Sequence, residues 1–209
     1  DRIARAAART GRRRQDVTLV AITKVFPASV IRDAYELGLR HFGENYVQEF
    51  EAKHPEVAGL PDARFHFVGH LQSNKAKRAA ELFDVIQTVD TPKLARRLNE
   101  TGKKLPVMIE VRLGEEGSKS GVDPSAIAPL IEAVRACPNL ELMGLMTMPP
   151  WSDDPETSRP YFAELRELAG QHGLAHLSMG MSHDLEVAIE EGATLVRVGT
   201  ALFGPRSAA

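Results

Sequence analysis

The sequence predicts an α/β protein built as a single (β/α)8 barrel of the TIM type, covering residues 1–209. Short apolar runs alternate with longer amphipathic stretches along the whole chain, which is the pattern of parallel βαβ units. Such units close either as an open doubly wound sheet or as a barrel. Eight units without a change of composition favour the barrel. The sequence contains no internal repeat, linker or low-complexity segment, so we expect one domain.

Eight runs have the length and composition of buried strands. In chain order they cover residues 17–23, 39–43, 64–69, 84–89, 106–113, 141–146, 175–178 and 194–198.

The stretches between these runs begin and end on residues that are typical of helix termini. Pro27 begins the first of these helices and Gly38 ends it. Three later helices begin just after an aspartate that precedes a proline by one or two residues: Asp90, Asp123 and Asp154. We expect them to end near Gly102, Pro138 and Gly170.

Composition excludes several classes of function. The chain is 43% hydrophobic and 26% charged, with a net charge of −2, so no basic surface indicates a nucleic acid or an anionic membrane as partner. The single cysteine, Cys137, excludes a disulfide framework, and the seven histidines lack the spacing of metal ligands. No apolar stretch reaches about 18 residues and no signal peptide is visible, so we expect a cytoplasmic protein.

Polar residues gather where a barrel places its active site, at the C-terminal ends of the strands. They follow the first, second, third, sixth, seventh and eighth runs, at Lys24 and in segments 43–46, 70–74, 146–149, 178–182 and 197–200. Lys24 has two interpretations. Its stem could lie on the core while its head reaches water. Alternatively, partial burial lowers its pKa, and the free amine attacks an aldehyde.

Two loops of small residues indicate a site for an anion. The segment from Ser178 to Ser182 contains Gly180 and leads into a helix, and Gly199-Thr200 follows the last strand. Barrels often bind phosphate in the loops after strands seven and eight, where backbone N–H groups and hydroxyls face the ligand. The alternative is that the glycines serve tight turns and the serines cap the helix.

Arg197 lies inside an apolar run, and a buried guanidinium needs a partner because it stays charged. That partner is either a carboxylate, as in a structural ion pair, or a ring nitrogen or phosphate of a ligand. We infer that the ligand is a phosphorylated aldehyde. Lys24 offers an amine for the aldehyde, the opposite rim offers a phosphate site, and Arg197 places a cation between them. Pyridoxal 5′-phosphate fits this description.

The chain also resembles the pyridoxal phosphate homeostasis protein family along nearly all of its length. The matching segments are Ala21-Ile-Thr-Lys24, His41-Phe-Gly-Glu-Asn-Tyr-Val-Gln48, His66-Phe-Val-Gly-His-Leu-Gln-Ser-Asn-Lys75, Glu116-Gly-Ser-Lys-Ser-Gly121, Gly144-Leu-Met146, Leu177-Ser-Met-Gly-Met-Ser182 and Arg197-Val-Gly-Thr-Ala-Leu-Phe-Gly204. All of them in this order form a highly specific match. The resemblance implies a barrel like the N-terminal domain of alanine racemase.

The resemblance also assigns roles to matching positions. It implies that Lys24 binds pyridoxal 5′-phosphate as a Schiff base, the internal aldimine, and that Arg197 faces the pyridine nitrogen. The residues implied to bind the phosphate are Ser178, Ser182, Gly199 and Thr200, and those implied to line the pocket around the ring are Asn45 and Met146. His66 and Asn74 fall in further family motifs, and segment 115–121 lies at the pocket rim in the family.

An arginine at the pyridine nitrogen has a consequence for chemistry. The cation disfavours protonation of the ring, and an unprotonated ring is a poor electron sink. The related racemases share this arginine but use a tyrosine from a second domain as a base, and this sequence contains no such domain. We therefore expect a cytoplasmic, monomeric carrier of the cofactor without catalytic residues, with pyridoxal-phosphate-dependent apoenzymes as transient acceptors.

Two enzymatic alternatives remain open at this point. One is an amino-acid racemase-like activity that uses the same cofactor. The other is an aldolase that forms its Schiff base between Lys24 and a phosphorylated sugar.

Overall fold

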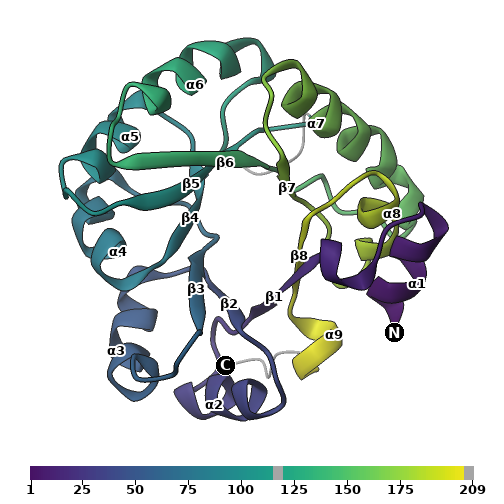
Figure 1. Ribbon diagram of the computed structural model, residues 1–209, viewed down its shortest axis with the longest axis horizontal. Helices are drawn as coiled ribbons and strands as arrows, with labels where there is room; N and C mark the ends of the chain where they lie inside the picture. Colours follow the sequence, from purple (N-terminus) through teal and green to yellow (C-terminus); the bar gives the residue numbers. More distant parts are fainter. Residues whose placement is uncertain (115–119, 205–209) are drawn as a thin grey trace.

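The computed structural model describes residues 1–114 and 120–204, in which eight parallel strands form one closed barrel. Neighbours in sequence are neighbours in the barrel, and β1 pairs with β8 to close it (Figure 1). The barrel expected from the sequence is therefore confirmed, and the open sheet is excluded. The strands are β1 Thr18–Ile22, β2 His41–Glu44, β3 Arg64–Phe67, β4 Val85–Val89, β5 Leu105–Glu110, β6 Leu140–Met146, β7 His176–Ser178 and β8 Leu195–Val198.

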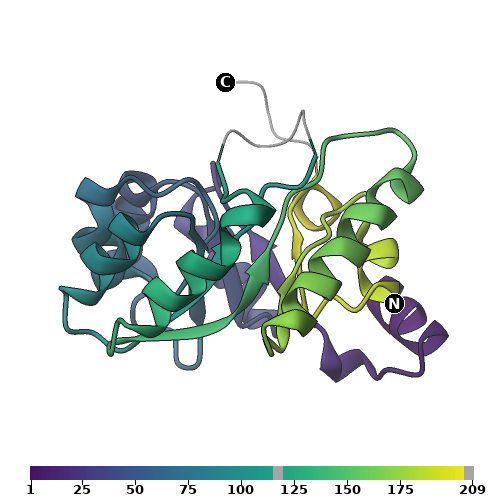
Figure 2. The same cartoon turned by 90° about the horizontal axis from the view of Figure 1, so that it is seen from above.

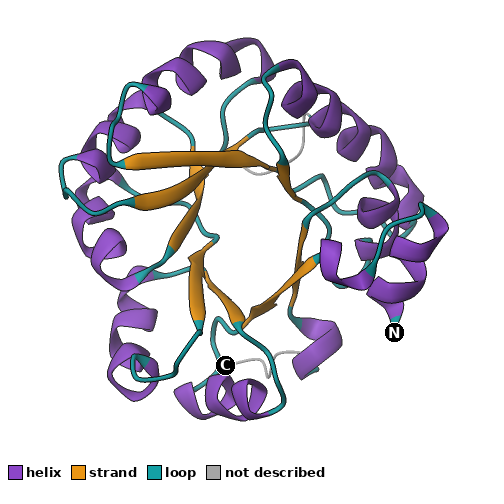
Figure 3. Ribbon diagram, in the orientation of Figure 1, coloured by secondary structure: helices purple, strands orange, loops and turns teal. Residues whose placement is uncertain are grey.

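Helices surround the barrel on the outside (Figure 3). They are α1 Arg2–Arg9, α2 Ala28–Glu36, α3 Val47–Val57, α4 Ala76–Leu82, α5 Pro92–Asn99, α6 Ile127–Arg135, α7 Arg159–Gln171, α8 Leu185–Glu190 and α9 Thr200–Phe203. Short 3-10 turns cover Arg14–Asp16, Ser73–Lys75, Pro124–Ala126 and Pro155–Ser158.

Several expected element boundaries need correction. Strand β3 ends at Phe67 and strand β5 ends at Glu110, because the residues that follow leave the ladder. After β5, Val111 forms an isolated bridge to Val122. The N-cap of α5 is Thr91 rather than Asp90, and its hydroxyl accepts a hydrogen bond from the Leu94 N–H.

The core has two layers, because successive strand residues point to opposite faces. The apolar part of the layer inside the barrel is a cluster of four buried residues among those described, Val20, Met108, Met146 and Leu195. The layer between strands and helices is larger and rich in phenylalanine. Phe50 of α3 lies 4.8 Å from both the Phe65 and the Phe83 rings, so α3 is fixed against β3 and α4.

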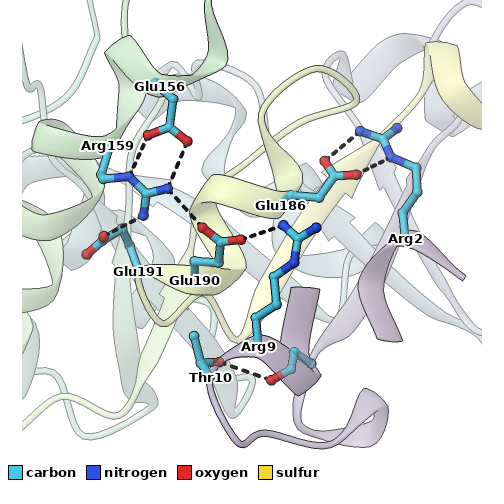
Figure 4. A network of polar contacts seen from close by, with 9 residues as sticks. Arg2, Arg9, Thr10, Glu156, Arg159, Glu186, Glu190 and Glu191 are labelled. Carbon is cyan, nitrogen blue, oxygen red and sulfur yellow. Dashed lines mark hydrogen bonds and ion pairs between the residues drawn. The ribbon is translucent and has the colours of Figure 1, made fainter. Parts of the chain in front are cut away.

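A network of ion pairs attaches the N-terminal helix to the last part of the barrel (Figure 4). Arg2 binds Glu186 through two hydrogen bonds of 2.6 and 2.7 Å, and Arg9 binds Glu190 at 2.9 Å. Arg159 of α7 reaches Glu190 at 2.8 Å. These pairs are partly exposed, so each contributes little stability alone. Together they hold α1 against α8, on the outside of the barrel (Figure 2).

Candidate functional site

A pocket of about 520 Å³ lies at the C-terminal ends of β1, β2 and β8. Six of the eight residues predicted to bind the cofactor line it: Lys24, Asn45, Ser182, Arg197, Gly199 and Thr200. The rest of its wall is mainly apolar and consists of Ile22, Val68, Met148, Trp151, Met181, His183 and Ala201. This volume is typical of sites for small molecules, and so is a mostly apolar wall with a few convergent polar groups.

The other two predicted residues do not line this pocket. Met146 is fully buried in the layer inside the barrel, where it packs with Val20 and Met108. Ser178 is also fully buried, and its hydroxyl accepts a hydrogen bond from Arg197. In this structure Ser178 therefore holds a residue of the pocket wall, and Met146 lies in the core beneath it.

Arg197 is buried, and its partners are two neutral oxygen atoms. Its Nη1 donates to Ser178 Oγ at 2.7 Å and its Nη2 to the carbonyl oxygen of Thr147 at 2.8 Å. Burial lowers the pKa of Arg197 to about 10, while the charges of Asp184 and Glu110 act to raise it. The guanidinium is therefore protonated at neutral pH. No carboxylate of the described residues pairs with it, so the structural ion pair considered above is absent from this part of the chain.

The hydrogen bonds of Arg197 continue across the inside of the barrel. Ser178 Oγ donates to Gln87 Oε1 at 2.6 Å, and Gln87 Nε2 lies 3.0 Å from His66 Nδ1. His66 Nε2 lies 2.9 Å from His41 Nδ1. We call these five residues, from His41 to Arg197, the interior polar chain.

The interior polar chain has a single consistent direction. Arg197 can only donate, so the Ser178 hydroxyl donates onward to the Gln87 oxygen. The Gln87 amide then donates to His66 Nδ1, and the proton of a neutral His66 must lie on Nε2, facing His41. Burial lowers the pKa of His66 to about 3, so the neutral ring that this direction requires is present at neutral pH.

Sequence reasoning missed Gln87 and His41 and gave no function to His66. All three lie on strands with apolar neighbours that face the helices, such as Phe42 and Phe65. Each of them is a polar residue at an inward-facing position of a buried strand, and that pattern could have indicated a hydrogen-bonded group inside the barrel. Which of these residues meet inside the barrel depends on the register of five strands.

The two loops of small residues meet at the pocket. Gly180 has a φ of +89°, and a Cβ there would lie 2.4 Å from the Ala188 Cβ, so only glycine fits. Ser182 Oγ accepts a hydrogen bond of 3.1 Å from the Ala201 N–H. The loop after β7 is thus joined to the loop after β8. Both belong to the region where barrels bind phosphate.

An aromatic pair forms another part of the wall. Trp151 is 71% exposed, and its ring lies 4.8 Å from that of His183. Among the described residues, two buried side-chain polar atoms have no hydrogen-bond partner, His183 Nε2 and Glu110 Oε2. His183 lines the pocket, so a ligand there could meet an unsatisfied polar atom.

A hollow of about 620 Å³ lies outside the barrel between α4 and α5. Its wall carries both Lys77 and Lys93 and the carboxylates Glu81 and Glu100. It contains none of the predicted cofactor-binding residues, and its charges are mixed. The pocket above Arg197 is therefore the better candidate for a functional site.

Residues 1–114 and 120–204 contain no group of three His, Cys, Asp or Glu side chains that could hold a metal ion. Over the same residues, no helix is long and apolar enough to cross a membrane. Most of the predicted rim segment 115–121 lies outside the described residues, which resume at Ser120.

Residues 1–207 match the family model described as alanine racemase, N-terminal domain. The chain is 44% identical to the pyridoxal phosphate homeostasis protein of Aquifex aeolicus, over 99% of this chain and 94% of that protein. It is 47% identical to the protein of the same name from Pseudomonas aeruginosa, over 98% of this chain and 91% of that protein. The chain belongs to the family of pyridoxal phosphate homeostasis proteins.

Solved structures of other proteins have the same fold. A structure of PipY from Synechococcus elongatus with PLP bound has a TM-score of 0.86 and 38% identity, and the match covers 98% of this chain and all of that one. An alanine racemase from Clostridium difficile has a TM-score of 0.73 at 14% identity, over 92% of this chain and 53% of that one. The second likeness shows the barrel fold alone.

Proposed function

We propose that this protein binds pyridoxal 5′-phosphate in the pocket above Arg197, linked covalently to Lys24, and serves the homeostasis of this cofactor and the balance of amino and keto acids. One observation carries the proposal. A lysine, a buried cation and two joined small-residue loops line the same pocket. The name of the relatives and the PLP bound to PipY support the same ligand.

The residues present fit the chemistry of this ligand. Ser182 and the backbone at Gly199 and Thr200 offer hydrogen-bond donors for a phosphate, since the first N–H groups of a helix have no partner within it. A Cβ on Gly199 would approach Ile22 no closer than 3.4 Å, so the protein itself leaves space there. Apolar residues such as Val68 and Met148 suit the faces of an aromatic ring.

In this assignment each residue has a defined task. The Lys24 amine would hold the aldehyde carbon, the two loops would hold the phosphate, and Arg197 would face the ring nitrogen. When bound, the cofactor supplies a conjugated ring that can accept electrons from an attached amino acid. Arg197 opposes that role, because a permanent cation disfavours a proton on the ring nitrogen. We therefore propose a carrier without robust catalysis, with apoenzymes that need the cofactor as acceptors and a monomer as the working form.

Visible absorbance tests the binding proposal directly. The protein mixed with pyridoxal 5′-phosphate should turn yellow, and borohydride should remove the colour and leave the ligand permanently attached. Lys24→Ala should bind without this colour and lose the ligand after borohydride and dialysis. A Lys24→Ala protein that keeps the full absorbance band would contradict the assignment of the lysine.

Exchange in deuterated water separates a carrier from an enzyme. The loaded protein is incubated with single L-amino acids, and the loss of the α-proton is followed by NMR. We expect exchange far slower than the turnover of typical enzymes, which is about 10 per second. Exchange at that rate would instead support the racemase-like alternative.

A further inference from the structure

The backbone on either side of Lys24 has an unusual conformation. Thr23 is fully buried and points outward, toward α3, while Lys24 and Ile22 line the pocket on the inner side. Val25 has a φ of +64°, in the left-handed region that β-branched residues rarely adopt. Strained residues of this kind persist only where surrounding contacts hold them, and they concentrate at functional sites.

Three charged side chains lie behind this segment. Glu44 at the end of β2 is fully buried, and Lys53 of α3 is nearly so. The Lys53 Nζ contacts Glu44 Oε1 at 3.0 Å and Glu49 Oε1 at 2.6 Å. Burial raises the pKa of Glu44, and the nearby Lys53 ammonium acts against that rise. We call Glu44, Lys53 and Glu49 the buried charge cluster.

Each member of the buried charge cluster binds a group next to Lys24. Lys53 Nζ donates to the carbonyl oxygen of Thr23 at 3.0 Å, and Glu44 Oε1 accepts from the Thr23 hydroxyl at 2.8 Å. Glu49 Oε1 accepts from the Val25 N–H at 2.5 Å. The cluster therefore holds the chain on both sides of Lys24 and satisfies the backbone of the strained residue.

Stability alone does not account for such a cluster. The other residues on the buried face of α3 are Val47, Phe50 and Val57, all apolar. An apolar residue in place of a buried ion pair is often as stable or more so, because both charges lose their hydration. Lys53 thus occupies a core position at which a charge is costly unless it serves a specific arrangement.

We propose that Glu44, Lys53 and Glu49 are positioning residues that hold the Lys24 amine in place for the cofactor's aldehyde. This inference rests on the proposed function. The Lys24 nitrogen forms a C=N bond with the aldehyde carbon, and the aldehyde oxygen leaves as water with the two amine protons. A fixed backbone at Thr23 and Val25 keeps the amine within reach of that carbon, and displacements of about 1 Å can reduce such reactions about 100-fold.

A comparison of two ligands distinguishes an effect on the position of the Lys24 amine from an effect on the whole pocket. Pyridoxal 5′-phosphate carries the aldehyde, whereas pyridoxine 5′-phosphate has an alcohol there and cannot bond to lysine. Trp151 is the single tryptophan and lines the pocket, so its fluorescence reports the binding of both ligands. The wild type should bind the aldehyde more tightly, because only that ligand gains the covalent bond.

Glu49→Ala and Lys53→Met should weaken the binding of pyridoxal 5′-phosphate and slow the rise of its yellow colour, each by roughly tenfold or more. The affinity for pyridoxine 5′-phosphate should change by less than about twofold. Glu49→Gln keeps an oxygen for the Val25 N–H and should restore most of the wild-type rate. Glu51→Ala is the matched control, because it removes an exposed ion pair from the same helix, the one with Arg78.

Three results would overturn the inference: unchanged binding of both ligands, equal weakening of both, or no recovery in Glu49→Gln. If a thermal melt shows that Lys53→Met does not fold, the test rests on Glu49→Ala. Glu49 is partly exposed, so its replacement should leave the protein folded. Failure of the proposed function gives a different result. The wild type would then bind the two ligands equally and show no yellow colour. That result would contradict the proposed function and the positioning role together.

Discussion

Arg197 contributes a positive charge to the pocket that no carboxylate of the described residues neutralises by contact. Its hydrogen-bond partners are the Ser178 hydroxyl and the Thr147 carbonyl, both neutral. An ion pair would have reduced its field at the pocket, whereas neutral acceptors orient the guanidinium and leave its charge. The fixed position of that charge depends in turn on Gln87, which accepts from Ser178.

Gln87→Leu should therefore destabilise the protein and loosen Arg197. The change leaves the proton of the buried Ser178 hydroxyl without an acceptor and His66 Nδ1 without a donor, which costs about 1–3 kcal/mol per group. Denaturant unfolding measures the stability, and Trp151 fluorescence measures the affinity for pyridoxine 5′-phosphate, which should fall. Gln171→Leu, at the exposed end of α7, should change stability by less than about 0.5 kcal/mol. Equal stability of the two variants would show that the interior polar chain is not held by Gln87.

At the scale of elements, the site is formed where the loops after β7 and β8 come together. Gly180 allows the first loop to pass close to α8, and Ser182 receives the Ala201 N–H from the second. Asp184 binds the same loop through the Met181 N–H at 2.7 Å and accepts from Ser158 at 3.0 Å. The loops are thus fixed by short local contacts to α8 and to the turn before α7.

Gly180→Ala should displace the loop after β7. The new Cβ would overlap Ala188, and the φ of +89° is unfavourable for alanine. We expect a lower unfolding temperature and weaker binding of pyridoxine 5′-phosphate, which has the phosphate but no aldehyde. Gly170→Ala is the control: its Cβ meets nothing within 4 Å, and alanine favours the helix α7. Wild-type affinity and melting temperature in Gly180→Ala would contradict this role of the glycine.

At the scale of the whole molecule, the inside of the barrel is unusual in being partly polar. Barrel interiors are commonly filled by bulky branched residues. Here the interior polar chain crosses from β2 to β8, and apolar residues such as Val20 and Met108 fill the remaining space. The chain of hydrogen bonds connects Arg197 in the pocket wall to His41 on β2.

The buried histidine makes the stability of the molecule depend on pH. The pKa of His66 is about 3 in the folded protein and about 6.5 in the unfolded chain, so the unfolded chain binds more protons between these values. The stability that the neutral His66 contributes is complete above pH 6.5. Below pH 6.5 the free energy of unfolding falls by up to about 1.4 kcal/mol per pH unit, until the pH reaches the folded-state pKa. The carboxyl groups of Glu44 and Glu110 act in the opposite direction, because burial raises their pKa.

NMR isolates the His66 contribution from these carboxyl groups. The Cε1–H signal of His66 should keep a constant chemical shift from pH 8 to pH 5, as a neutral ring requires. His66→Gln should reduce the pH dependence of unfolding over the same interval. A titration of the His66 signal near pH 6.5 would contradict the direction assigned to the interior polar chain.

The sequence by itself determined the order of the strands, the closure of the barrel and six of the residues around the pocket. Its information was local: apolar runs for strands, capping residues for helices, and polar residues where strands end. Because all strands of a barrel are parallel, these ends meet at one rim whatever the details of packing. Lys24, Arg197 and Gly199 could be assigned to the pocket in this way.

The tertiary structure alone decided which buried groups meet. The side chains of Ser178 and Met146 lie below the pocket wall rather than in it, because strand register sets their depth. The interior polar chain needs five strands in register, and the buried charge cluster needs α3 packed against the end of β1. Such contacts join residues far apart in the chain, and composition and spacing carry no information about them. Lys24 could be found from the sequence, but the cluster that holds its neighbours could be found only from the folded chain.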